Sequence, residues 1–187
     1  MSIECCQDLG GYFLSVVDDA ARVRRVSLSA PTRAYVAEVL AACAGPGASE
    51  RLGASLVLQL EQALRPETAR DVGQAEALRS VGDAALCRSG LFVGDAPLAV
   101  CVRVGQFAYR EAALRSHGPR VEALETLGRE FTQVVDVVAE VAEATALGAV
   151  TRDLVRLYDR WREADSARAL ERLQAQGLFP LKVEVEG

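Results

Sequence analysis

The sequence predicts an all-α protein, a single-domain bundle of about six to eight helices followed by a short strand-like or disordered C-terminal tail. Apolar residues recur at every third or fourth position through most of the 187 residues. Breaks that contain glycine or proline divide these stretches into helix-length segments. A chain of this length can form a stable core without a metal or a disulfide. We expect the domain to span residues 1–180 and the tail residues 181–187.

Each expected helix has its own spacing, start or stop signal. Ser29 can cap the second helix, and Pro31 suits the first turn of that helix. The breaker Gly45–Pro46–Gly47 ends it, and His117–Gly118–Pro119 ends the fifth helix. Gly177 suits a left-handed cap after the last helix. The expected helices are residues 11–25, 29–44, 52–64, 66–93, 98–116, 121–142, a segment around 154–161 after Gly148, and 166–175.

Residues 121–142 and the C-terminal tail have different periods of apolar residues. Valines and leucines between Val121 and Ala142 follow steps of three and four, which predicts a strongly amphipathic helix despite the weak helix preference of valine. In the tail, apolar residues alternate with charged ones from Leu181 to Glu186, which is a strand-like period. A single strand has nothing to pair with in a helical domain. The tail is therefore expected to be disordered, docked on the body, or offered to a partner as an edge.

Composition and cysteine usage indicate a cytoplasmic protein. The net charge is -5, and lysine occurs only once, which is typical of GC-rich bacterial genomes. The longest stretch without a charged residue or histidine, Val39 to Ser49, is too short to span a membrane. The first eight residues do not resemble a secretory signal. With five cysteines and no C-x-x-C pair, a disulfide framework is unlikely, and we expect Cys43, Cys87 and Cys101 to act as small apolar residues.

No catalytic or metal-binding constellation is recognisable. The single histidine, His117, lies in a predicted loop, where it is more typical of a surface residue than of a general base. Five scattered cysteines and one histidine match no zinc-ligand spacing. The adjacent Cys5 and Cys6 are candidate oxidisable thiols. We therefore expect no cofactor and no metal, and the sequence favours a protein that is not an enzyme.

Charged residues give two further interpretations. Arg22, Arg24 and Arg25 form a basic group, which we take as a candidate patch for an anionic partner. Glu140 and Glu143 flank the valine-rich helix and are expected to form a solvated face. Arginines after residue 150 are interleaved with acids, which favours salt bridges along a helix. Together with the acidic total, this argues against nucleic acid as a partner.

Glycines within the expected helices are the most specific pattern. Gly82, Gly90 and Gly105 each cost about 1 kcal/mol relative to alanine in a helix. Close contact between helices at these positions is the favoured explanation, and a kink or break at Gly90 beside a pocket is the alternative. Asp83 and Ser89 lie next to these glycines. If they are partly buried, they need hydrogen-bond partners.

Four motifs form a recognisable set along the chain: VGDxALxxSGxF from Val81, GxxAY from Gly105, LVRLYxRW from Leu154 and QGLFP from Gln176. Together they resemble a family of bacterial cytosolic all-helical proteins that has no established activity. The resemblance covers roughly residues 29–180, and the sequence departs from the family pattern at Val102–Arg103–Val104. The resemblance implies an all-helical fold and no mechanism.

These observations favour a non-enzymatic regulatory or protein–protein interaction module that self-associates, with another protein or a second copy as its partner. The alternative is a small-molecule-binding protein with a pocket between its helices. The residues expected to contact the ligand or partner are Asp83, Ser89, Gly90, Tyr109 and Trp161.

Overall fold

The computed structural model of the protein describes residues 9–44, 55–65, 71–91, 97–145, 161, 164 and 166–175. These residues form seven helices and no strand, which confirms the all-α prediction. The predicted tail and most of the helix expected around residues 154–161 lie outside the described residues. The helices are α1 (Leu9–Arg24), α2 (Ala30–Ala44), α4 (Leu56–Ala63), α5 (Asp71–Leu91), α6 (Leu98–Arg115), α7 (Val121–Thr145) and α9 (Ala167–Ala175).

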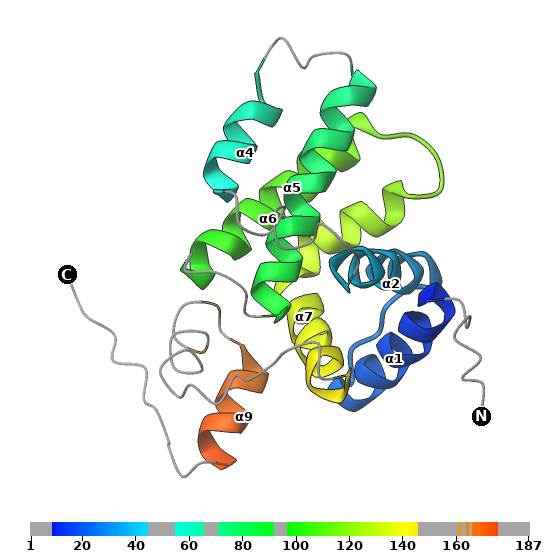
Figure 1. The fold of residues 1–187 in the computed structure, drawn as a ribbon, viewed down its shortest axis with the longest axis vertical. Helices are drawn as coiled ribbons and strands as arrows, with labels where there is room; N and C mark the ends of the chain where they lie inside the picture. Colours follow the sequence, from blue (N-terminus) through cyan, green and yellow to red (C-terminus); the bar gives the residue numbers. More distant parts are fainter. Residues whose placement is uncertain are drawn as a thin grey trace, which may run out of the picture.

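Helices α5 and α6 form the centre of the bundle (Figure 1). Two contacts show that they run antiparallel. Arg115, near the end of α6, bonds Gln74 near the start of α5. Gly105, earlier on α6, faces Ala85, which lies later on α5. Helix α7 packs against both of them, α1 and α2 cover α7, and α4 packs on α5. Helix α9 lies beside α7, away from α4 (Figure 1).

Side-chain caps set several helix starts. The Ser29 hydroxyl accepts a hydrogen bond from the Thr32 amide at 3.4 Å, which confirms Ser29 as the cap of α2. Helix α4 starts at Leu56 rather than at the predicted Leu52, because Ser55 is its N-cap and has non-helical backbone angles. At α9, the Ser166 hydroxyl accepts from the Ala169 amide at 3.3 Å.

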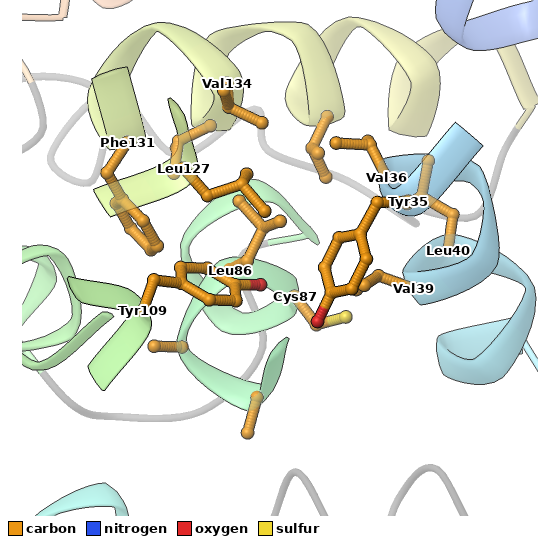
Figure 2. Packing of buried hydrophobic residues seen from close by; sticks show 14 of the residues in the cluster. Tyr35, Val36, Val39, Leu40, Leu86, Cys87, Tyr109, Leu127, Phe131 and Val134 are labelled. Carbon is orange, nitrogen blue, oxygen red and sulfur yellow. The ribbon is translucent and has the colours of Figure 1, made fainter. Parts of the chain in front are cut away.

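Helix α7 carries the amphipathic stripe that its sequence predicts. Its backbone is non-helical at one residue, Glu130 (φ −111°, ψ 25°), and it continues to Thr145. Burial of valine, leucine and phenylalanine side chains along one face places this helix at the core, with Tyr109 and Tyr35 packed nearby (Figure 2). The fully buried large side chains of α7 include Leu124, Leu127, Phe131, Val134 and Val138.

The helical glycines receive side chains from neighbouring helices. A Cβ atom at Gly82 would lie 2.7 Å from the Tyr109 ring, and a Cβ at Gly105 would overlap the Phe131 ring. At Gly90, it would overlap Val138. Helix α5 is continuous through Gly82 and Gly90 to Leu91. The packing interpretation is therefore confirmed, and α5 is helical at both Gly82 and Gly90, one residue before its end at Leu91.

We expect Gly90→Ala to lower the free energy of unfolding by about 1–3 kcal/mol, because the new methyl group overpacks Val138. At an open helical position the same change would stabilise by about 1 kcal/mol. Urea unfolding measures the effect. In a Val138→Ala background, the Gly90→Ala penalty should shrink or reverse. An undiminished penalty in that background would show that Val138 is not the cause.

Polar side chains attach α9 to α7. The buried Ser166 hydroxyl donates to Asp136 Oδ1 at 2.5 Å. The Arg168 side chain, only 5% exposed, pairs with Glu140 at 3.3 Å and with Glu143. Burial is the main reason that the pKa of Arg168 is lowered, and the two glutamates oppose it. The prediction that Glu140 and Glu143 form a solvated face holds for Glu143, which is exposed, and only in part for Glu140, which is half-buried where α9 returns along this edge of α7.

Cys43 and Cys87 form a disulfide that joins the last turn of α2 to α5, with Cα atoms 6.7 Å apart. The prediction that these two residues act only as small apolar side chains, without a disulfide, is wrong. They lie 44 residues apart in sequence, and only the packing of α2 against α5 brings them together. Cys101 is a buried thiol, as expected, and burial raises its pKa.

Candidate functional site

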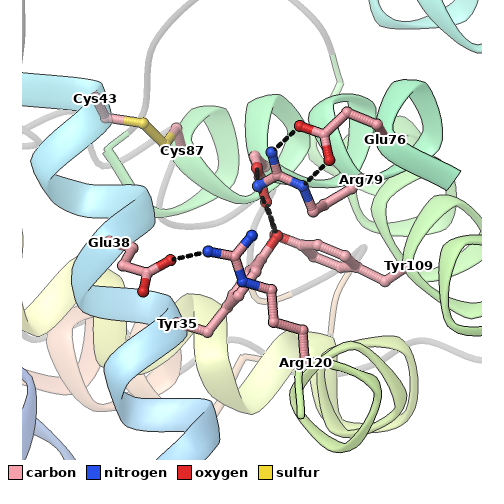
Figure 3. Close-up of polar contacts among 9 residues, drawn as sticks. Tyr35, Glu38, Cys43, Glu76, Arg79, Cys87, Tyr109 and Arg120 are labelled. Carbon is pink, nitrogen blue, oxygen red and sulfur yellow. Dashed lines mark hydrogen bonds and ion pairs between the residues drawn. A yellow bond between two sulfur atoms is a disulfide. The ribbon is translucent and has the colours of Figure 1, made fainter. Parts of the chain in front are cut away.

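A cluster of polar side chains at the α2–α5–α6 junction is the candidate site (Figure 3). Its centre is Asp83 on α5. Tyr35 on α2 donates its hydroxyl to Asp83 Oδ1 at 2.7 Å, and Tyr109 on α6 donates to the same oxygen at 2.9 Å. One turn earlier on α5, Arg79 donates from Nη1 to Asp83 Oδ2 at 3.1 Å. One carboxylate thus receives donors from three helices.

Local packing explains why these side chains meet. Because Gly82 has no side chain, the Tyr109 ring lies against α5, and its hydroxyl reaches the next residue, Asp83. The Tyr35 ring meets the Tyr109 ring edge-on, with centroids 6.2 Å apart. On its other side, Tyr109 contacts Phe131, with centroids 6.0 Å apart (Figure 2). The aromatic side chains therefore place both hydroxyls at the carboxylate.

Charges on α5 extend the cluster towards solvent. Arg79 also donates from Nε to Glu76 Oε2 at 2.8 Å, and this hydrogen bond is the main cause of the lowered pKa of Glu76. The same partner raises the pKa of the Arg79 guanidinium, which stays charged. Glu38 and Arg120 pair nearby at 3.3 Å on the exposed side (Figure 3).

Burial dominates the electrostatics of the central groups. It raises the pKa of Asp83, although the tyrosine hydrogen bonds and Arg79 partly oppose it. Burial, together with the charge of Asp83, also raises the pKa of Tyr35 and of Tyr109. Both phenols therefore remain protonated at neutral pH and act as donors.

This arrangement is suited to joining helices rather than to acid–base chemistry. Both oxygens of Asp83 already accept hydrogen bonds from protein donors. A general base needs a carboxylate oxygen that can reach a substrate proton. In Asp83, three of the roughly four acceptor positions of the carboxylate are taken by Tyr35, Tyr109 and Arg79. The cluster is thus a polar cross-link between α2, α5 and α6.

The structure brings together only part of the predicted contact set. Asp83 and Tyr109 are in direct contact. Ser89 and Gly90 lie farther along α5, where Gly90 faces Val138, and they take no part in the cluster. Trp161 belongs to a separate apolar cluster beside α9, with Ala169, Leu170 and Leu173.

Sequence reasoning missed Tyr35 and Arg79. The i, i+4 spacing of Arg79 and Asp83 is a signal for an ion pair on one helix face and was available from the sequence. Tyr35 carries no such signal, because it comes from another helix, 48 residues away in sequence.

Two of the three arginines in the candidate patch for an anionic partner already pair with carboxylates of the protein. Arg22 pairs with Asp19 at 2.6 Å, and both side chains are exposed. Arg24, only 11% exposed, pairs with Glu171 of α9 at 2.6 Å. Arg25 is exposed and follows α1 directly, with φ 55°. Binding of an anion at these arginines stays a prediction, and a bound anion would have to compete with these carboxylates.

The structure also locates the remaining candidate features among the described residues. His117 is exposed in the α6–α7 connection. Among the described residues, no group of three or more His, Cys, Asp or Glu side chains is arranged to hold a metal ion. None of the described helices is both long enough and apolar enough to cross a membrane.

An open pocket of about 410 Å³ lies between the α1–α2 connection and α7. Its lining residues are Ser27, Leu28, Ser29, Glu122, Glu125, Thr126, Arg129 and Glu130.

Fold and site together define an all-α helical protein whose central polar cluster cross-links helices. The sequence matches no family model, and the comparisons with curated proteins and with solved structures found no match. The resemblance to a bacterial all-helical family therefore stays a prediction.

Proposed function

We propose that the protein is a non-enzymatic regulatory or interaction module that self-associates. The observation that carries the proposal is the outer face of α6. Phe107 is 42% exposed there, and Leu114, two turns later on the same face, is 76% exposed. Large apolar side chains that share an exposed helix face are typical of surfaces that bind another protein.

The central cluster supports a role without catalysis. Asp83, its most buried carboxylate, is already bound by two tyrosines and an arginine. The polar groups of the cluster therefore hold the helices in place and leave surface residues to make outside contacts.

Small-molecule binding is the alternative, and the structure offers it little support. The pocket expected near Asp83, Ser89 and Tyr109 would need polar groups directed at a ligand, whereas Asp83 and Tyr109 bond each other. The open pocket beside α7 is lined by other residues, three of them glutamates.

The cellular compartment in which the protein folds is a separate question from its function. Composition and cysteine usage predict a cytoplasmic location, whereas the Cys43–Cys87 disulfide is typical of proteins that fold in oxidising compartments. Trapping thiols by alkylation at cell lysis decides between them. Reduced Cys43 and Cys87 would support the cytoplasm, and an oxidised pair would favour an oxidising compartment.

Native mass spectrometry of the purified full chain tests self-association. We expect masses at a whole-number multiple of 20.0 kDa with no added mass. A chain that stays monomeric at tens of micromolar would overturn the proposal. A reproducible extra mass that is released on denaturation would instead favour the small-molecule alternative.

A further inference from the structure

We infer that the outer face of α6 is the self-association surface, and that it binds the same face of a second copy in antiparallel orientation about a two-fold axis at Phe107. This inference rests on the proposed self-association and adds its surface, orientation and contacts. It is drawn from the spacing of apolar and charged residues along α6.

Four exposed residues form one stripe along α6. Arg103, Phe107, Arg110 and Leu114 follow one another at steps of four, three and four, so they share one helix face. Val100, one turn before Arg103 and half-buried, extends the apolar part of this face. From Val100 to Leu114 the stripe is about 21 Å long at 1.5 Å per residue.

A two-fold axis at Phe107 pairs the apolar ends of the stripe and brings Arg103 to Glu111, which lies next to the stripe on the same helix face. Such an axis pairs residues that lie equally far before and after Phe107 on antiparallel helices. Val100 then meets Leu114 of the second copy, and Phe107 meets its own equivalent. Arg103 meets Glu111 of the second copy, so each dimer contains two such opposite-charge pairs. A parallel pairing would instead place Arg103 against Arg103.

The charged groups are available for these contacts. Among the described residues, Arg103 has no carboxylate partner, and its Nε bonds only the Ala99 carbonyl oxygen at 3.4 Å. Glu111 is one-quarter exposed and uses Oε2 for Arg115 at 2.5 Å. Its Oε1 atom is therefore the oxygen we expect to meet Arg103. Arg110, the other cation of the stripe, is held against α7, because its Nε donates to the Gly128 carbonyl oxygen at 2.9 Å.

Charge exchange between two variants gives the sharpest test. Arg103→Glu and Glu111→Arg each place like charges opposite one another in a homodimer, and we expect each to weaken dimerisation by about tenfold or more. Mixing the two variants restores both opposite-charge pairs in a heterodimer. Native mass spectrometry distinguishes the three species when one variant carries a heavy-isotope label. Preferential heterodimer formation is the expected result, and a statistical mixture would overturn the inference.

A second pair of variants does not depend on charge. Phe107→Ser removes the central apolar contact, and we expect it to weaken the dimer by about thirtyfold. Tyr12→Ser is the matched control, because Tyr12 is an aromatic residue of α1 that is 48% exposed. It should leave the dimer intact. Sedimentation velocity measures association, and far-UV circular dichroism checks that each variant is folded.

The outcomes separate this inference from the proposed function. A wild-type chain that is monomeric overturns both. A wild-type oligomer that Phe107→Ser leaves unchanged overturns the α6 interface, while self-association stands through another surface.

Discussion

Reducing the Cys43–Cys87 disulfide is expected to lower the free energy of unfolding by about 4 kcal/mol. The two cysteines lie 44 residues apart, so the bond closes a long loop and restricts the unfolded chain. It also fastens the last turn of α2 to α5. Urea unfolding of the wild-type protein, with and without dithiothreitol, measures the difference.

Two variants identify the cysteines responsible. Cys43→Ala should unfold at the same urea concentration with and without reductant, because it has no bond to reduce. Cys101→Ala should keep the full reductant effect, because Cys101 is a thiol outside the disulfide. Equal stability of the wild-type protein in both conditions would contradict the expected role of the bond.

Replacing Asp83 with alanine is expected to lower the free energy of unfolding by about 3 kcal/mol. The change leaves the fully buried Tyr109 hydroxyl without its acceptor and removes the carboxylate from Arg79. The Asp83 side chain is 22% exposed, so water offsets part of the loss, and a larger effect is not expected. Urea unfolding monitored by circular dichroism measures it.

Asp83→Asn is the matched control for the shape of the side chain. Its carbonyl oxygen can still accept from Tyr35 and Tyr109, which both bond Oδ1, whereas its NH2 group replaces the oxygen that faces Arg79. We expect a loss of about 1 kcal/mol. Equal losses for alanine and asparagine would show that the tyrosine hydrogen bonds contribute nothing measurable.

We also expect the difference in stability between the wild-type protein and Asp83→Asn to depend on pH. Burial raises the pKa of Asp83 in the folded state above its ordinary value of 3.8, so the folded chain binds more protons at this residue than the unfolded chain. The contribution of Asp83 to stability is full below that ordinary pKa and is lost as the pH rises through the raised folded pKa. Relative to Asp83→Asn, the wild-type protein should therefore lose stability over this window. Parallel pH curves would contradict the expectation.

Both predictions concern the attachment of α2 to α5. Tyr35 and Cys43 lie two turns apart on α2, and their partners Asp83 and Cys87 lie one turn apart on α5. The polar cluster and the disulfide thus join the same two helices at two levels (Figure 3). Reduction combined with Asp83→Ala should consequently cost more than either change alone.

Several features of the fold were predictable because they are local. The amphipathic period of residues 121–142 identified α7, and Ser29 was recognised as a cap because it acts on an amide three residues away. The glycines at 82, 90 and 105 were recognised as close-contact sites from their helical setting alone. Which side chain fills each site was not predictable, since Tyr109, Phe131 and Val138 come from other helices.

The sequence by itself determined the helical class and most helix positions, because period, caps and breakers act within a few residues. Only the tertiary structure decided the partners across helices. It paired Tyr35 with Asp83 and Cys43 with Cys87, and it placed Trp161 away from them. The physical reason is that such contacts depend on how whole helices pack, and the spacing within one helix does not record which helix lies opposite.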